Sequence, residues 1–537
     1  MGKFYLYLFL FITSAVFSQE DAWVYFNAKP NSQSYFGTPL QMLSQRALDR
    51  RTNQNIALDL KDIPIELSYI NQIRAVVGIS VLAKSKWLNA LHVRGNQSAI
   101  NSLKSFSFVD KIDFANKSLN LSGKTKQAAK INVANKKRDA KVVYPYGFSS
   151  NQIQMLNGHL LHQQNYTGSG KIIAVLDAGF PGVNTIQPFQ RLRDNNQILG
   201  GYDYVSRNAN FYAGDSHGTS VLSTMGGYKE NALVGTAPDA SYYLFITEDT
   251  ASENPVEESL WVEAAEKADS LGVDIINTSL GYFDYDDTAY SHAYSEMDGE
   301  TAFMSRGAEI AYSRGMIIVT SAGNSGGSAD PYIAVPADAV SVIAVGAVNS
   351  TETITSFSSI GPSYDGRVKP DVMAQGQATI MSDEFGNIVT GNGTSFSCPV
   401  TAGMIACLWQ AFPSKTNQEI RQLVLQCSDR FLNPTSQYGY GIPDFNLALS
   451  NGLPLDSFSK AFFVVYPNPS SDLVLVSLTE ENSEGTVTLY AVSGEKILEE
   501  KISTKSPTFS IKSLSRGMYI YNIESNGFCK SGKIMKQ

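Results

Sequence analysis

The segment Lys171-Ile-Ile-Ala-Val-Leu-Asp177 is almost unbroken in apolar side chains and ends at a carboxylate. Such a run is typical of a strand that is buried on both faces of a parallel sheet. Similar runs follow at residues 242–246, 273–279, 316–321 and 340–348. Residues 256–271 carry apolar side chains at helical spacing, and Gly272 follows as a C-terminal cap. This alternation predicts a doubly wound, mostly parallel α/β domain over residues 147–452.

The segments before this domain have a different composition. Residues 19–115 alternate strand-like pieces, such as 75–79, with a polar helix-like stretch at 43–51, which predicts a small α+β domain. Residues 111–141 contain nine Lys or Arg against two Asp, and few large apolar side chains that could form a core. We therefore expect an exposed linker over residues 116–146 that proteases can cut during maturation. The alternative is a basic surface patch for a polyanion.

After residue 451 the pattern changes to short strands separated by turn signals. Strand-like runs occur at residues 462–466, 473–478, 486–492, 496–502 and 518–523. Pro-Asn-Pro, Ser-Gly and Arg-Gly steps lie between them, and Ser493-Gly494 suits a hairpin turn. This pattern predicts a small all-β sandwich over residues 460–537.

The composition of the whole chain narrows the class of protein. Its 537 residues suffice for three or four domains, and 43% hydrophobic with 17% charged residues indicates a globular protein. The net charge of −8 disfavours a nucleic-acid-binding surface. Lys3 precedes an apolar run that is too short to span a bilayer, and Val16-Phe17-Ser18 suits a signal peptidase. Residues 1–18 are therefore predicted to be a signal peptide, and no later stretch predicts a transmembrane helix in the mature form.

The four cysteines form no metal or dithiol pattern. Cys398, Cys407, Cys427 and Cys529 are irregularly spaced, without a C-x-x-C pair. Cys407 and Cys427 fall on two consecutive predicted helices and can reach each other in a disulfide. The alternative is that they are buried free thiols.

Three polar residues follow the predicted strands or begin predicted helices. Asp177 ends a buried strand, so its carboxylate is expected at the carboxyl edge of the sheet, where open α/β folds bind ligands. His217 lies in Asp-Ser-His-Gly-Thr-Ser-Val, where Gly218 permits close backbone approach. Ser395 precedes a helix that runs to about residue 409, and Pro399 suits the first turn of that helix.

These residue types together suit nucleophilic catalysis. A serine hydroxyl needs a base to remove its proton, and the base needs a third group to fix its tautomer. Ser395, His217 and Asp177 supply these roles. Asn324 follows the 316–321 run at the same sheet edge, and its side-chain N–H with the Ser395 backbone N–H can form an oxyanion hole.

The chain resembles the subtilisin-type serine proteases of the subtilase family. The order Asp177, His217, Ser395 is that of the family. Motifs similar to those of the family occur in family order at Val175-Leu-Asp177, His217-Gly-Thr219, Asn277-Thr-Ser-Leu-Gly281, Ser321-Ala-Gly-Asn324, Ser356-Phe-Ser-Ser-Ile-Gly-Pro362, Lys369-Pro-Asp-Val372 and Gly393-Thr-Ser395.

The resemblance implies where a substrate binds. Ser279, Leu280 and Gly281 would form the strand with which the substrate backbone pairs, and Ala322 with Gly323 would line the pocket for the side chain before the cut bond. The chain departs from the family pattern at three positions, none of which removes a catalytic group. Ala178 stands where the family usually has Ser or Thr, Gln375 replaces a usual Pro, and Ser220 stands where a second His is common.

The flanking segments also resemble known domains. Residues 19–115 are similar to propeptides of this family, which makes the basic linker the region cut on maturation. Residues 466–537 resemble the sorting domain of the type IX secretion pathway of Gram-negative bacteria, through Tyr466-Pro-Asn-Pro469 and Leu514-Ser-Arg-Gly-Met-Tyr519. This resemblance implies export by the type IX machinery to the cell surface or the medium.

The sequence therefore predicts a secreted serine endopeptidase that is made as a zymogen and acts on protein or peptide substrates. Two alternatives are an inactive protease-like surface binding protein and an esterase, although Gly393-Thr-Ser-Phe-Ser397 lacks the second Gly of an esterase elbow. No cofactor is expected. Relatives can hold structural calcium, but its sites cannot be located here, and the acidic residues 284–300 fit no EF-hand and predict a solvated insertion.

Overall fold

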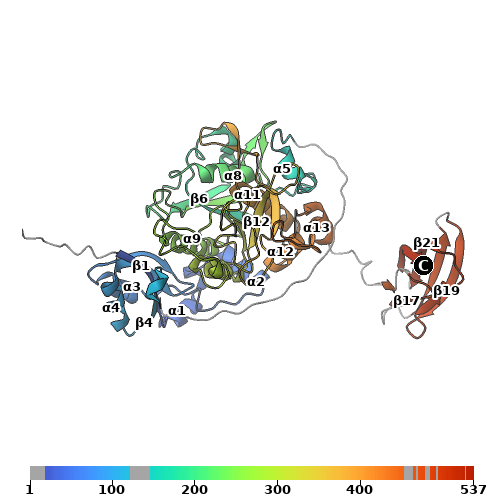
Figure 1. Cartoon of the computed structure of the whole chain (residues 1–537), viewed down its shortest axis with the longest axis horizontal. Coiled ribbons are helices and arrows are strands. Elements are labelled where there is room, and N and C mark those ends of the chain that lie inside the picture. Colours follow the sequence, from blue (N-terminus) through green and yellow to red (C-terminus); the bar gives the residue numbers. More distant parts are fainter. Residues whose placement is uncertain are drawn as a thin grey trace, which may run out of the picture. The chain divides into compact units, whose positions relative to one another are not determined.

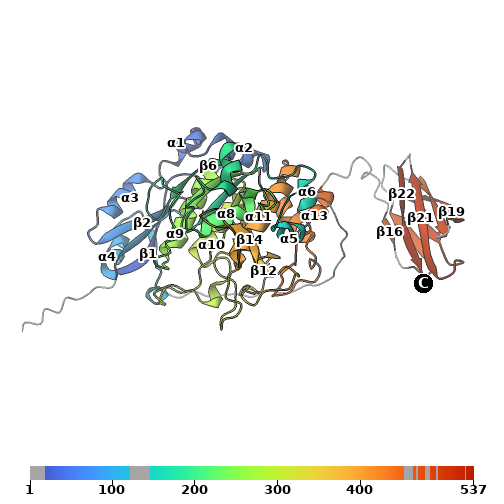
Figure 2. The same ribbon diagram turned by 90° about the horizontal axis from the view of Figure 1, so that it is seen from above.

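The computed structural model describes residues 19–120, 145–452, 464–466, 470–477, 484–491, 494–525 and 528–537 (Figures 1 and 2). The chain divides into two compact units, the first ending at Gly452 and the second beginning at Leu453. The predicted signal peptide and most of the predicted linker lie outside the described residues.

A seven-stranded parallel sheet forms the centre of the first unit, in the order β13-β12-β11-β10-β5-β9-β6. Its strands are β5 (Ile172–Asp177), β6 (Ile198–Asp203), β9 (Ser241–Ile246), β10 (Ile275–Thr278), β11 (Ile317–Ser321), β12 (Ile343–Val348) and β13 (Val372–Gln375). From β5 the chain goes to the edge strand β6, returns to β9 beside β5, and then crosses to the other side of β5 at β10. The predicted doubly wound α/β fold is confirmed, and β5 lies where the winding direction reverses.

Helices cover both faces of this sheet. On one face lie α8 (His217–Gly226) and α11 (Thr394–Ala411), which share a core with Ile173 and Val175 of β5. On the other face lie α9 (Val256–Leu271) and α10 (Phe303–Ser313), which share a core with Ala174 and Leu176. Successive side chains of β5 therefore enter opposite cores, as the apolar run predicts.

The cap of α9 also follows its sequence. Gly272 adopts φ 82° at the C-terminal cap, a left-handed conformation that a residue with Cβ adopts only at a cost. The remaining elements of this domain are α5 (Ser150–Gln154), α6 (His159–His162), η4 (Gln187–Phe189), α7 (Gln190–Asp194), β7 (Tyr228–Lys229), β8 (Leu233–Val234), η5 (Tyr294–Glu296), β14 (Thr379–Ser382), β15 (Ile388–Gly391), α12 (Asn417–Gln426) and α13 (Phe445–Gly452).

Residues 19–120 form a smaller α+β domain with an antiparallel sheet of order β2-β3-β1-β4. The strands are β1 (Gln19–Phe26), β2 (Ile79–Ser85), β3 (Ala90–Asn96) and β4 (Val109–Phe114). The helices are α1 (Ser32–Gly37), η1 (Pro39–Gln41), α2 (Gln45–Asn53), α3 (Leu67–Arg74), α4 (Gln97–Ser102), η2 (Leu103–Ser105) and η3 (Lys117–Leu119).

Two expectations for this region were wrong. The strand predicted over 75–79 begins only at Ile79, because Ala75 is the C-cap of α3. The described fold continues through the first residues of the linker expected over 116–146, since η3 covers Lys117–Leu119. Ile112 and Phe114 are buried in β4, and the described fold continues to Asn120, so alternate burial outweighs the local excess of positive charge.

The second unit contains two antiparallel sheets around one apolar core, in the orders β16-β17-β20 and β19-β18-β21-β22. Its strands are β16 (Val464–Tyr466), β17 (Leu473–Ser477), β18 (Glu484–Ala491), β19 (Lys496–Ser503), β20 (Thr508–Ser510), β21 (Gly517–Ser525) and β22 (Phe528–Lys536). The predicted hairpin joins β18 to β19, and Gly494 there has φ 89°. Strands β20 and β22 were not predicted.

Three observations concern the remaining predictions for the chain. Cys407 and Cys427 are buried free thiols and form no disulfide. Within 284–300, the side chains of Tyr285 and Tyr290 are buried while Asp286 is exposed, so the insertion is anchored by aromatic residues. In the described part of the chain no three metal-ligating side chains are grouped to hold an ion, and none of the helices there is long and apolar enough to cross a membrane.

Candidate active site

Asp177 and His217 meet at the carboxyl end of β5. Asp177 is the last residue of the strand and is fully buried, and His217 is the first residue of α8. The His217 Nδ1 lies 2.7 Å from Asp177 Oδ1, within hydrogen-bonding distance. Gly218 allows this approach, because a Cβ atom there would lie 2.4 Å from the Gly179 carbonyl oxygen.

The Asp177 carboxylate has one well-satisfied oxygen. Its Oδ1 also accepts a hydrogen bond of 2.8 Å from the Ala178 backbone N–H. Its Oδ2 is buried and has no hydrogen-bond partner among the described residues. A hydroxyl at position 178, which the family usually has, would be next to this carboxylate, so the Ala178 departure coincides with the unsatisfied oxygen.

The surroundings of His217 favour its protonated form. Burial opposes the charge, but the negative charge of Asp177 and the hydrogen bond to it outweigh burial, and Asp215 and Glu248 add to the effect. Together they raise the pKa of His217 to about 9. The Asp215 carboxylate also accepts a hydrogen bond of 2.8 Å from the His217 backbone N–H.

Ser395 and Ser279 are joined by two reciprocal hydrogen bonds. Ser395 is the second residue of α11, and its Oγ donates to the Ser279 carbonyl oxygen at 3.1 Å. The Ser279 Oγ in turn donates to the Ser395 carbonyl oxygen at 2.8 Å. Pro399 explains the second bond, because a proline has no N–H to donate to the carbonyl four residues earlier.

The position of Pro399 corrects one expectation. Because α11 begins at Thr394, Pro399 is its sixth residue and lies inside the helix, not in the first turn. The hydrogen bond lost from the helix is replaced by the Ser279 side chain. Ser279 therefore holds the backbone of the residue that was predicted to be the nucleophile.

Asn324 is oriented by the residue next to Ser395. Its Oδ1 accepts hydrogen bonds from the Thr394 backbone N–H at 2.9 Å and from the Thr394 hydroxyl at 3.0 Å. Its Nδ2 has no hydrogen-bond partner among the described residues, so a donor is free at this point of the cleft. Thr394 was not predicted, although its position beside Ser395 at the start of a helix was visible in the sequence.

A cleft of about 480 Å³ brings most of the predicted residues together. It is lined by Ala178, Asp215, His217, Glu248, Thr250, Ser279, Leu280, Gly281, Ser321, Gly323, Asn324 and Ser395. Asp177 is fully buried next to His217 and is not itself a lining residue of the cleft. Ala322, predicted to line the pocket, is fully buried with Ile333, Ala337 and Ala344, because it follows β11 on the side away from the cleft.

Glu248 is one of the cleft residues that sequence reasoning missed. It follows β9 at the same sheet edge as Asp177, and its Oε2 accepts a hydrogen bond of 2.6 Å from the Tyr282 hydroxyl. Burial, together with the nearby carboxylates of Glu253 and Asp177, raises the pKa of Glu248 to about 7 against the opposing effect of the Tyr282 hydrogen bond. The signal was available in the sequence, since polar residues that follow a buried strand mark this edge, and Glu248 is the second residue after β9.

Comparison with known proteins shows the family of the protease domain. The model of the subtilase family matches residues 168–441. The chain belongs to the subtilase family. Subtilisin NAT of Bacillus subtilis subsp. natto and subtilisin E of Bacillus subtilis strain 168 are each 32% identical over 304 residues, which cover 56% of this chain and 69% of theirs. The solved prenylagaramide maturation protease PagA is 19% identical, with a TM-score of 0.43, and covers 55% of this chain and 98% of its own.

The two flanking segments of this subtilase also match family models. Residues 21–134 match the peptidase S8 propeptide domain of Bacteroidota, and residues 464–537 match a secretion system C-terminal sorting domain. The chain is therefore a serine endopeptidase with a propeptide, which makes it a zymogen. The sorting domain indicates a secreted or cell-surface protein that uses the type IX secretion pathway.

Proposed function

We propose that this subtilase hydrolyses peptide bonds through a triad of Asp177, His217 and Ser395 and an acyl-enzyme intermediate. The observation that carries the proposal is the hydrogen bond of 2.7 Å between His217 Nδ1 and the buried Asp177, in the cleft that Ser395 also lines. A buried carboxylate fixes the tautomer in which Nδ1 carries the proton and Nε2 is free to accept one.

The first half of the reaction forms an ester. The Ser395 hydroxyl turns from the Ser279 carbonyl toward His217, and Oγ attacks the scissile carbonyl carbon while its proton passes to His217 Nε2. The negative charge that develops on the carbonyl oxygen is stabilised by Asn324 Nδ2 and the Ser395 backbone N–H. His217 then gives the proton to the leaving nitrogen, the C–N bond breaks, and the acyl group stays on Ser395.

The second half releases the acid. Water loses a proton to His217 and attacks the ester carbon, and the proton returns to Ser395 Oγ as the C–O bond breaks. Throughout both halves Asp177 stabilises the protonated His217 and keeps its ring in place.

The substrate backbone is expected to pair with Ser279, Leu280 and Gly281, which extend from the end of β10 along the cleft. Gly323 lines the same cleft and is expected to border the site of the side chain that precedes the cut bond. The natural substrates of this pairing are proteins or peptides outside the cell.

A serine-directed fluorophosphonate probe tests the proposal. The chain should be labelled at Ser395 and should hydrolyse a peptide library, and Ser395→Ala should lose both the label and the hydrolysis. Ser397→Ala is a matched control, because its hydroxyl bonds only within α11, to the Thr394 carbonyl oxygen. Absence of label on the intact chain would contradict the proposal and favour an inactive binding protein. Turnover of esters without turnover of peptides would favour an esterase.

A further inference from the structure

A cavity of about 880 Å³ lies between the N-terminal domain and the protease domain and shares no lining residue with the catalytic cleft. Four consecutive residues of β2, 81–84, and four consecutive residues of β6, 199–202, line it. Successive residues of a strand face opposite sides of the sheet, so a cavity that contacts four in a row runs along the edge of each strand. We name it the edge cavity.

Neither of these edges has a neighbouring strand among the described residues. The seven-stranded sheet ends at β6, and the antiparallel sheet of the N-terminal domain ends at β2. On β6 the described pairing beyond the sheet is the bridge between Asp203 and Asn208, in the loop that follows the strand. An open edge presents backbone N–H and C=O groups that can pair with an added strand.

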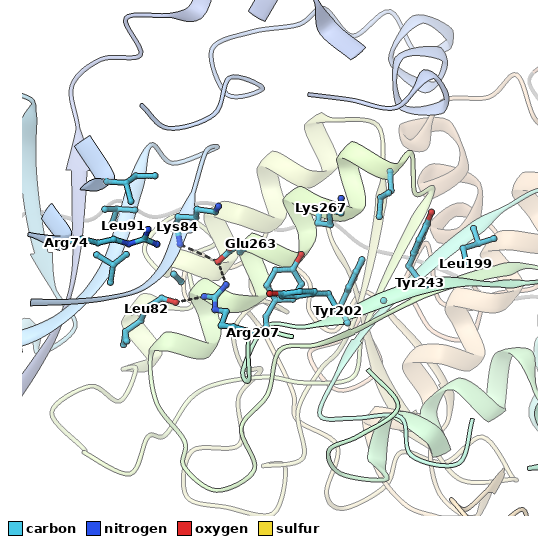
Figure 3. A pocket seen from close by; sticks show the side chains of 18 residues that line it. Arg74, Leu82, Lys84, Leu91, Leu199, Tyr202, Arg207, Tyr243, Glu263 and Lys267 are labelled. Carbon is cyan, nitrogen blue, oxygen red and sulfur yellow. Dashed lines mark hydrogen bonds and ion pairs between the residues drawn. The ribbon is translucent and has the colours of Figure 1, made fainter. Parts of the chain in front are cut away.

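Side chains of the protease domain cover the β2 edge. The Leu82 carbonyl oxygen accepts a hydrogen bond from Arg207, and the Lys84 backbone N–H donates to Glu263 at 3.4 Å (Figure 3). Arg207 and Glu263 also pair with each other at 2.8 Å. The β6 edge over residues 198–202 is therefore the side of the cavity that can accept a strand.

A glycine keeps this part of β6 accessible. A Cβ atom at Gly200 would have one neighbour within 4 Å, Cε1 of Tyr243 at 3.8 Å, so the space beside it is otherwise open. Position 200 thus places no side chain over the Tyr243 ring. Glycine inside a strand weakens that strand and often marks a point where another backbone approaches closely.

The floor of the edge cavity is aromatic. Tyr243 and Phe245 alternate along β9, and their rings are parallel with centroids 6.1 Å apart. Tyr202 of β6 meets the ring of Tyr204 edge-on, with centroids 4.9 Å apart. Tyr202 and Tyr243 are only half-buried, so apolar ring surface faces the cavity beside the open edge. Side chains of an added strand would remove this surface from water.

The walls of the edge cavity carry an excess of positive charge. Arg74, Lys84, Arg207 and Lys267 line it, and Glu263 is the one acidic residue among its described lining residues. Arg207 is paired with Glu263, whereas the side chains of Arg74, Lys84 and Lys267 have no hydrogen bond or ion pair in the part of the chain that the structure describes. Such walls attract a segment of negative charge.

We propose that the edge cavity binds an extended acidic peptide segment of another protein, which adds as a strand to the β6 edge at residues 198–202. Side chains on one face of the added strand lie on the aromatic floor, and its carboxylates pair with Lys84 and Lys267. This binding does not depend on the proposed function, because the catalytic cleft contributes no residue to the cavity. It gives the uncut chain a recognition site separate from its catalytic residues.

Fluorescence polarisation with the full Ser395→Ala chain tests this binding, since the chain without its proposed nucleophile stays uncut. The probe is a labelled hexapeptide of alternating Glu and Val, and the control replaces each Glu with Lys. The acidic peptide should bind at concentrations up to about 1 mM, and the basic peptide should not. No binding of the acidic peptide, equal binding of the basic one, or displacement by an equal concentration of citrate would overturn the proposal.

Two further peptides test whether the segment binds as a strand. Each carries N-methyl groups on alternate amides, one at the Glu positions and the other at the Val positions. A strand pairs through the N–H groups of every second residue, so one methylated peptide should bind at least about tenfold more weakly and the other should bind like the parent. Equal binding of the two methylated peptides would overturn strand addition to β6.

A matched pair of charge reversals locates the site. Lys267→Glu on α9 and Lys104→Glu on η2 change the net charge equally, both at exposed positions, and Lys104 does not line the cavity. Lys267→Glu should weaken binding of the acidic peptide at least about fivefold, and Lys104→Glu less than about twofold. Equal effects would place the peptide elsewhere, for example in the cleft, and would overturn the proposal.

Discussion

The Ser279 hydroxyl offers a direct test of how the Ser395 backbone is held. Pro399 cannot donate to the Ser395 carbonyl oxygen, and the Ser279 Oγ does so at 2.8 Å. Ser279→Ala therefore leaves a buried carbonyl without this partner. A buried polar group that loses its hydrogen bond costs about 1–3 kcal/mol, so the free energy of unfolding should fall by about this amount.

The loss is measured in the Ser395→Ala background, which keeps the carbonyl but prevents self-digestion. Urea unfolding of this chain, followed by the fluorescence of the protease domain, should show a lower midpoint with an unchanged slope. Ser450→Ala is the control, because the Ser450 hydroxyl is exposed and bonds within α13, to the Asn446 carbonyl oxygen. A surface change of this kind should alter the free energy by less than about 0.5 kcal/mol.

The same substitution should slow the active chain. If the whole cost appears in the transition state, kcat falls about five- to 150-fold, at about 1.4 kcal/mol for each factor of ten. KM should change little, because the substrate pairs with backbone groups that the substitution keeps. A free energy of unfolding within 0.3 kcal/mol of the parent, together with an unchanged kcat, would refute the reasoning.

Three further predictions concern the same cleft. Only neutral His217 can act as a base, and its pKa is raised to about 9, so kcat/KM should rise about tenfold per pH unit between about pH 6 and 8 and reach half its limit near pH 9. Glu248→Gln removes a negative charge near His217 and should move this pH profile to lower pH. A kcat/KM that stays constant from pH 7 to 9 would contradict the role of neutral His217 as the base. Asn324→Ala should reduce kcat about 10²–10³-fold, the loss known for an oxyanion donor in subtilisin of the same family, and turnover within about threefold of the parent would exclude the role. Ala178→Ser offers a hydrogen-bond donor to the unsatisfied Asp177 Oδ2 and should raise the free energy of unfolding by about 0.5–1.5 kcal/mol. The change is measured by urea denaturation in the Ser395→Ala background. A loss of stability would show that the new hydroxyl does not reach the Asp177 carboxylate.

The fold of the protease domain was largely predictable, because its signals are local. The apolar run to Asp177 predicted β5 to within one residue, and the periodicity of residues 256–271 with Gly272 predicted both ends of α9. In the same domain the free thiols of Cys407 and Cys427 could not be distinguished from a disulfide in the sequence. That choice depends on how two helices are placed, which no local pattern records.

The candidate site was predictable to the level of the sheet edge. Asp177 ends β5, His217 begins α8 and Asn324 follows β11, and each of these positions places a side chain at the carboxyl edge of the sheet. The cleft at that edge brings His217 and Asn324 together with Ser395. Thr394 was missed because its role depends on a hydrogen bond to a residue 70 positions away.

The burial of Arg50 and Arg51 in α2 was beyond sequence reasoning for a different reason. In the sequence, residues 43–51 show only a polar helix, and positive charge in a polar helix usually indicates a solvated face. Arg50 and Arg51 are buried because Asp269, more than 200 residues later, lies against them. A charge can be assigned to the interior only when its partner is known.

Local rules fail most clearly around Ser395, and this pattern is itself evidence of function. Gly393 has φ 152°, Pro399 interrupts the hydrogen bonds of α11, and Asp177 keeps a buried oxygen without a partner among the described residues. Each of these features departs from a local rule of folding, and all three belong to the elements that border the catalytic cleft. Exceptions of this kind are expected where selection acts on chemistry instead of on folding. Substitutions that remove them one at a time, such as Ala178→Ser, should therefore tend to stabilise the protein while they change its turnover.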